Sequence, residues 1–160
     1  MRWRSLIVLA SYALLATAMS AQGENAGDPS VGSWKLDIAK STFASNTPPK
    51  SETRTQRAVP GGIKIVIEDE YADGKKTRVE SLITYDGKPR RSTGTGIWDS
   101  TVSKRIDQNV SESDLLRNGR IVGSVRREVS PDGKTMKIVY VIHRPDGSTV
   151  STLSVFDRMQ

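Results

Sequence analysis

Apolar and polar residues alternate over long parts of the chain, as they do in strands that bury one face. In residues 63–68 isoleucine occupies alternate positions, while Lys64 and Glu68 fall on the opposite side. Residues 136–142 repeat this pattern, whereas residues 51–59 have almost no apolar side. Because successive side chains of a strand point to opposite faces, the pattern predicts a sheet with one apolar face that is interrupted by polar strands.

Glycine-containing turn sequences separate these runs at regular intervals. Asp-Gly and Asn-Gly tolerate the positive φ angles that tight hairpin turns require. The turn sequences are Pro60-Gly61-Gly62, Asp73-Gly74, Asp86-Gly87, Asn118-Gly119, Asp132-Gly133 and Asp146-Gly147. Regular turns between alternating runs predict consecutive antiparallel strands.

The predicted fold is an all-β, antiparallel up-and-down meander of about nine strands. We expect the strands at residues 31–37, 51–59, 63–71, 76–85, 101–107, 110–117, 120–129, 135–143 and 148–157. A long meander must protect its edge strands, and closing into a barrel does so. An open meander or a sandwich is the alternative.

Two segments lack a strand pattern. Residues 37–43 are expected to form one helical turn, capped by Ser41 or Thr42, before Pro48 and Pro49 end it. Residues 84–99 contain Pro89 and several glycines and are expected to form a loop.

The first segment has the features of an export signal. Arg2 and Arg4 precede an uncharged apolar run that is shorter than a typical membrane-spanning helix, and small residues follow it. We expect residues 1–21 to be a signal peptide, residues 22–30 a flexible leader and residues 31–160 the mature domain. The product would then be periplasmic or secreted, with no membrane span in the mature chain. A retained anchor is the alternative.

Composition excludes several functions. The 160 residues carry a formal net charge of +6, and without residues 1–21, which contain Arg2 and Arg4, 22 basic residues stand against 18 acidic ones, a charge of +4. This is below the excess typical of nucleic-acid binders, so no nucleic-acid partner is expected. The absence of cysteine removes disulfides, thiol nucleophiles and thiolate metal sites. His143 is the single histidine and has no identifiable catalytic partner. We therefore predict that the protein is not an enzyme, with no catalytic residue, no metal and no cofactor.

Two ends of the mature sequence resemble the calycin group, which includes lipocalins and fatty-acid-binding proteins. The first strand opens with Gly32-Ser33-Trp34-Lys35-Leu36, and the last ends with Val155-Phe156-Asp157-Arg158. The chain is more similar to a family of small exported bacterial lipocalin-like proteins of unassigned activity, through residues 32–43, 48–51, 72–75, 85–88, 104–107 and 129–136. The resemblance implies a barrel that Trp34 closes at one end, with Arg158 over its ring. The Arg-x-Tyr pair that often holds the carboxylate in fatty-acid-binding proteins is missing, because its positions read Ser154 and Phe156.

A barrel of this kind suggests two functions. The first is a non-catalytic carrier of a small apolar or amphiphilic molecule, with Tyr85, Trp98, Tyr140 and Phe156 as candidate lining residues. Arg126 is a further candidate ligand-binding residue. If Arg126 or its neighbour Arg127 points inward, the lumen is partly polar, and Glu112 or Glu128 is the expected counter-ion. The alternative is an envelope interaction protein with a filled barrel, which uses its outer face or its basic patches. The sequence leaves the oligomeric state open.

Overall fold

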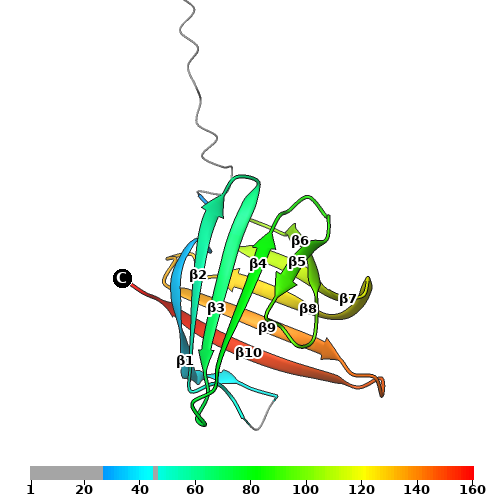
Figure 1. Cartoon of the computed structure of the whole chain (residues 1–160). Helices are drawn as coiled ribbons and strands as arrows, with labels where there is room; N and C mark the ends of the chain where they lie inside the picture. Colours follow the sequence, from blue (N-terminus) through cyan, green and yellow to red (C-terminus); the bar gives the residue numbers. More distant parts are fainter. Residues whose placement is uncertain (1–26, 45–46) are drawn as a thin grey trace, which may run out of the picture.

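The computed structural model describes residues 27–44 and 47–160, which form a closed antiparallel β-barrel (Figure 1). Its strands are β1 (Gly32–Thr42), β2 (Ser51–Val59), β3 (Gly62–Glu70), β4 (Lys76–Ile83), β5 (Arg90–Thr93), β6 (Ser100–Arg105), β7 (Val110–Arg117), β8 (Arg120–Val129), β9 (Thr135–His143) and β10 (Thr149–Arg158). The all-β barrel predicted from the sequence is confirmed.

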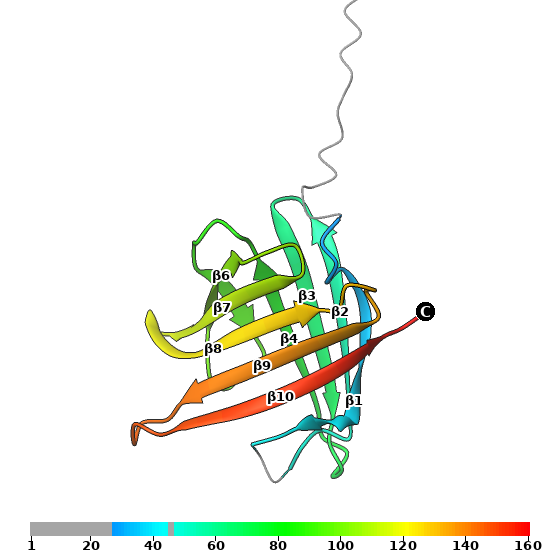
Figure 2. The same cartoon turned by 180° about the vertical axis from the view of Figure 1, so that it is seen from behind.

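Each strand pairs with the next one along the chain, and β1 also pairs with β10 to close the ring. Trp34 lies opposite Arg158 in this closing pair. Figures 1 and 2 show β2, β3 and β4 crossing over β8, β9 and β10, so the barrel is flattened into two crossed layers. The interior lies between these layers.

The structure has a strand that the sequence pattern did not predict. β5 lies inside the segment 84–99, which was expected to be a loop. It pairs with β4 through Ser92 opposite Ser81, and with β6 through Arg91 opposite Ser100. Because these pairings are short, the β4–β5–β6 seam has less backbone pairing than the long ladder between β3 and β4.

The helical turn expected at residues 37–43 is also wrong, since β1 continues to Thr42. The polar groups of this segment form a strand irregularity instead. The Ser41 hydroxyl donates to the Asp37 carbonyl and accepts from the Val155 backbone N–H on β10. The register of β1 against β10 shifts between Asp37 and Thr42. Side chain to backbone hydrogen bonds of this kind compete with helix formation.

The core follows the predicted alternation. Two clusters of buried apolar residues fill most of the interior: Trp34, Leu36, Leu115, Val125, Val129, Met136, Ile138 and Phe156 in one, and Ile63, Ile65 and Ile83 in the other. The inward faces of β2 and β6 and part of the inward face of β7 are polar, with Gln56, Ser103 and Ser113 buried among them. The lumen therefore combines apolar and polar walls.

The predicted signal peptide, residues 1–21, lies outside the described residues, as does the leader up to residue 26. Residues 28–30, which were expected to belong to a flexible leader, contact the barrel instead: Asp28 and Ser30 are both buried. Within residues 27–44 and 47–160, no helix has the length and apolar character needed to cross a membrane.

Candidate ligand site in the barrel lumen

A cavity of about 40 Å³ lies between the two layers. Its wall is formed by Arg54, Ile65, Ile67, Val79, Ser81, Ile83, Trp98, Thr101, Ser113, Leu115, Val125, Arg127 and Tyr140. These positions alternate along their strands with outward-facing residues, so the strand period places them together. The volume accommodates about three water molecules, or a ligand group of similar size.

Arg54 on β2 is a buried cation with an acidic partner. Its Nε lies 2.5 Å from Glu52 Oε1, and its Nη2 donates to the Tyr140 hydroxyl at 2.9 Å. The guanidinium also lies 4.8 Å from the ring centroid of Phe156. Burial alone would lower the pKa of Arg54, but Glu52 and Tyr140 outweigh it and raise the pKa above its usual range. Glu52 therefore balances the charge of Arg54 inside the barrel.

Arg127 on β8 is buried without such a partner. Its Nη1 donates to the Ser111 hydroxyl at 3.0 Å, and its Nε has no hydrogen-bond partner. Among the described residues no carboxylate forms an ion pair with Arg127. Burial lowers the pKa of Arg127, and the nearby charge of Arg54 acts in the same direction. An arginine remains protonated in proteins, so Arg127 is a buried cation with no carboxylate in direct contact, although the charge of Asp28 at the barrel end attracts it.

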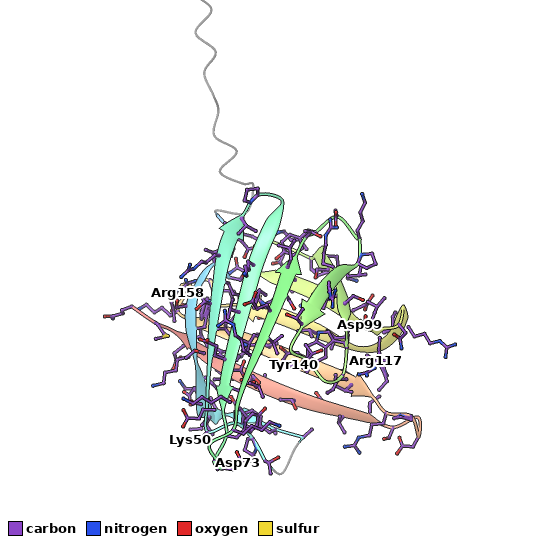
Figure 3. All side chains as sticks on the ribbon, in the orientation of Figure 1. Lys50, Asp73, Asp99, Arg117, Tyr140 and Arg158 are labelled. Carbon is purple, nitrogen blue, oxygen red and sulfur yellow. The ribbon has the colours of Figure 1, made fainter. Side chains whose placement is uncertain are left out.

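Two aromatic residues form the part of the wall near the β5–β6 link. The rings of Trp98 and Tyr140 stack with centroids 6.3 Å apart and planes inclined by 29°. The Tyr140 hydroxyl is occupied by Arg54, whereas Trp98 Nε1 is buried without a hydrogen-bond partner. Figure 3 shows Tyr140 within the barrel and Asp99, next to Trp98 in sequence, near its edge. These rings provide apolar contact area beside the polar wall.

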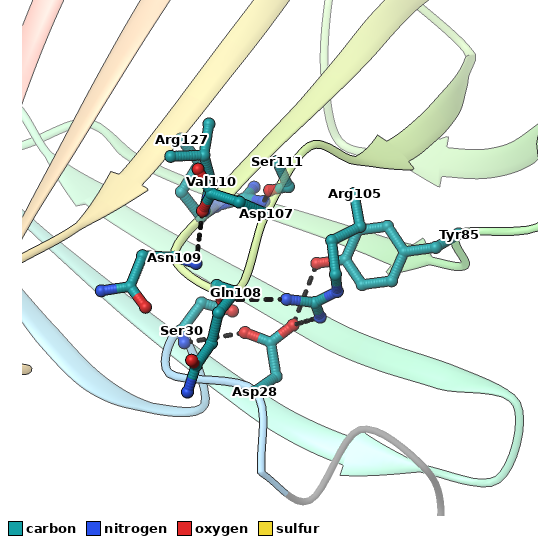
Figure 4. Close-up of polar contacts among 10 residues, drawn as sticks. All are labelled: Asp28, Ser30, Tyr85, Arg105, Asp107, Gln108, Asn109, Val110, Ser111 and Arg127. Atoms are coloured by element: carbon teal, nitrogen blue, oxygen red, sulfur yellow. Dashed lines mark hydrogen bonds and ion pairs between the residues drawn. The ribbon is translucent and has the colours of Figure 1, made fainter. Parts of the chain in front are cut away.

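A polar cluster covers the barrel end closest to Arg127 (Figure 4). The Asp28 carboxylate accepts hydrogen bonds from the Ser30 backbone N–H at 2.8 Å and the Tyr85 hydroxyl at 3.0 Å, and it forms an ion pair with Arg105. The Arg105 guanidinium lies 4.3 Å from the centre of the Tyr85 ring. Burial opposes ionisation of Asp28, but hydrogen bonds from Ser30 and the charge of Arg105 lower its pKa overall. These contacts hold residues 28–30, which precede β1, against this end of the barrel.

Trp34 on β1 and Arg158 on β10 close the same end of the barrel. The Trp34 side chain is fully buried, and its Nε1 donates to the Ser30 carbonyl at 2.8 Å. The Arg158 guanidinium lies 4.1 Å from the indole centre and donates to the carbonyls of Pro29, Val31 and Gly133. This pair holds the chain before β1 and the turn before β9 against the end of β10.

The structure brings together only part of the predicted lining. Trp98 and Tyr140 line the cavity. Phe156 packs in the core and Tyr85 belongs to the end cluster, so neither lines it. Arg126 is on the outer face, paired with Glu112 at 2.8 Å, and the inward arginine is its neighbour Arg127.

Sequence reasoning missed Arg54 and Asp28, and it named Arg127 only as the alternative to Arg126. Arg127 carries a recognisable signal, because it alternates with Val125 and Val129, which share the buried face of β8. Arg54 has no such signal, since the inward positions of β2 are all polar. Asp28 had been assigned to the leader.

The basic patches of the sequence, at residues 88–91, 104–105 and 126–127, include four residues that are paired with acidic neighbours. Lys104 and Arg126 both contact Glu112, Arg90 contacts Asp86, and Arg105 contacts Asp28. Balanced pairs attract a polyanion less strongly than a cluster of like charges does. In the part of the chain that the structure describes, no three acidic or histidine side chains are grouped so that they could hold a metal ion.

No known protein family matches the chain, and no curated protein does. The resemblance to exported lipocalin-like proteins stays an expectation from the sequence. The functional argument therefore depends on the lumen.

Proposed function

We propose that this chain is a non-catalytic binding protein that holds a small amphiphilic molecule in its barrel. The observation that carries the proposal is the mixed wall of the cavity. Ile65, Val79 and Leu115 provide apolar contact area, while Arg127 and Ser113 provide polar groups in the same space. Ligand sites in proteins combine a mostly apolar wall with a few placed polar groups in this way.

The size of the cavity limits the ligand. A space of about 40 Å³ accommodates a small group, and a longer chain requires the wall to move. The β4–β5–β6 seam is the part of the wall with the shortest strand pairing, where Ser81 lies opposite Ser92 and Arg91 opposite Ser100. Trp98 lies in the link between β5 and β6, so opening there would enlarge the cavity directly. We expect short amphiphiles to bind more readily than long ones.

The proposal is tested by a substitution that places a larger side chain in the cavity and by the same substitution on the outer face of the sheet. Val79 lines the cavity, whereas Val66, on the neighbouring strand β3, is in an outer groove. Val79→Phe should abolish binding of hexan-1-ol and hexanoate, and Val66→Phe, the same change outside the barrel, should leave it intact. Titration calorimetry gives the affinity and the number of sites, and a change in the tryptophan fluorescence, to which Trp98 in the cavity wall contributes, reports occupation of the lumen.

The expected result is one saturable site per folded chain in the unaltered protein. Equal binding by the two phenylalanine variants, or no binding by the unaltered protein, would refute the proposal. Native mass spectrometry of protein purified from its own host provides an independent check. A single discrete small-molecule adduct, lost in Val79→Phe, is the expected observation.

A further inference from the structure

Two exposed isoleucines lie on one edge of the barrel. Ile121, near the start of β8, is 57% exposed, and Ile97, in the link between β5 and β6, is 47% exposed. The Arg117 guanidinium donates to the Ile97 carbonyl at 3.2 Å, and the Asp99 backbone N–H donates to the carbonyl of Leu116, the residue opposite Ile121. These bonds hold the link against the β7–β8 hairpin, at the edge where Figure 3 shows Arg117 and Asp99.

Three exposed arginines surround these isoleucines. Arg117 and Arg120 lie opposite each other in the hairpin, and Arg91 on β5 pairs with the first residue of β6, next to Asp99. None of the ion pairs in the described part of the chain includes any of the three. Asp114, the next acidic residue of the hairpin, lies about 10 Å further along β7. Three arginines beside Asp99 therefore give this edge an excess of two positive charges.

We call this surface the hairpin edge; it consists of Arg91, Ile97, Arg117, Arg120 and Ile121.

Other exposed isoleucines lie in different surroundings. Ile38 and Ile106 are 43% and 47% exposed. The cations beside them in sequence, Lys40 and Arg105, are each paired with an aspartate. The hairpin edge differs because its arginines have no carboxylate in contact, so they can bind anions outside the chain.

Exposed aliphatic side chains next to free arginines fit the surface of an anionic bilayer. Aliphatic groups enter the boundary between headgroups and acyl chains, and guanidinium groups bind lipid phosphates. A dissolved polyanion would bind the arginines but would gain nothing from Ile97 and Ile121. A zwitterionic bilayer would accept the isoleucines but would gain little from the excess charge.

We propose that the hairpin edge docks the protein onto a bilayer that contains anionic phospholipids. Ile97 and Ile121 enter the headgroup boundary, and the three arginines contact lipid phosphates. The inference is independent of the proposed function, because it uses the outer surface and no residue of the cavity other than the neighbour of Trp98.

Sedimentation with vesicles measures this docking. Vesicles of phosphatidylcholine and phosphatidylglycerol, mixed about two to one, have a negative surface, whereas vesicles of phosphatidylcholine alone do not. Each arginine near such a surface strengthens partition about fivefold, so an excess of two charges predicts a preference of about 25-fold for the anionic vesicles at low salt. Added salt should reduce the preference by screening.

Two pairs of variants test the hairpin edge. Ile121→Ser and Arg120→Gln should each weaken binding to anionic vesicles about five- to tenfold. Ile106→Ser makes the first change at another exposed isoleucine, and Arg57→Gln makes the second at an exposed arginine of β2; both should leave binding unchanged. The proteins are purified from their own host and share one N-terminal segment, so differences between them report the substituted residue. Because all four side chains are exposed, the urea midpoints should stay the same.

Several results would overturn the inference. One is equal binding of the unaltered protein to the two kinds of vesicle, or to neither. Another is equal weakening by Arg57→Gln and Arg120→Gln, which would indicate attraction by the overall charge. Weakening by Arg120→Gln without any effect of Ile121→Ser would indicate a dissolved polyanion as the partner in place of a bilayer.

Discussion

Replacing Trp34 with alanine tests the packing that closes the barrel end. The indole is fully buried, donates to the Ser30 carbonyl and lies under the Arg158 guanidinium. Truncation of a buried tryptophan to alanine costs about 3–5 kcal/mol, because transfer energy is lost and a cavity remains. The orphaned Ser30 carbonyl and the lost cation–π contact place Trp34→Ala toward the upper part of that range, at about 4–5 kcal/mol.

Urea unfolding measures this loss. With a slope of about 2 kcal/mol per molar urea, the midpoint of Trp34→Ala should fall by about 2 M. Arg158→Met leaves the indole in place but removes its cation and three hydrogen bonds to backbone carbonyls, so it should cost about 2 kcal/mol. Trp34→Phe keeps most of the packing and should lie between Trp34→Ala and the unaltered protein. An unchanged midpoint in Trp34→Ala would refute the account of how this end is closed.

Three further changes test other parts of the structure. Arg127→Met should stabilise the ligand-free protein by about 1–3 kcal/mol and so raise its urea midpoint, because it replaces a buried charge that has no carboxylate in contact; a lower midpoint would contradict that reading. Asp28 has a lowered pKa in the folded state, so its stabilising effect is present above its ordinary pKa of 3.8 and is lost as the pH falls through the lowered value. The urea midpoint of Asp28→Asn should therefore depend less on pH in the acidic range than that of the unaltered protein, and parallel curves would disprove the effect. Gly94 has φ +82 and a Cβ there would collide with the Arg78 carbonyl, so Gly94→Ala should lower the melting temperature, whereas Gly96→Ala, which has open space, should not.

Much of the barrel could be predicted because alternation distinguishes its two faces. Ile63 and Ile65 on β3, and Met136 and Ile138 on β9, are buried as their spacing indicates. The turn at Asn118-Gly119 has φ angles of 51° and 75°, which its dipeptide also indicates.

Other features depend on contacts that no local pattern encodes. β5 (Arg90–Thr93) consists of polar residues on both faces, so it has no periodic signal, and it is a strand because β4 and β6 lie on either side. Asp28 is buried through partners far along the chain, including Arg105. Whether Arg126 or Arg127 points into the barrel depends on which alternate positions of β8 face inward, and a register shift by one residue exchanges the two faces. The valines at positions 125 and 129 would have resolved it.

The closing pair of the ring also sets the order in which the barrel can be completed. Each strand pairs with its neighbour in sequence, except that β1 must find β10, with Trp34 opposite Arg158. Local hairpins can form as soon as their two strands exist, while this last ladder requires nearly the whole domain to have been synthesised. Until then the meander has two unpaired edges that invite association with other chains. Loss of β10, by truncation or proteolysis, would therefore leave an aggregation-prone open sheet in place of a smaller barrel.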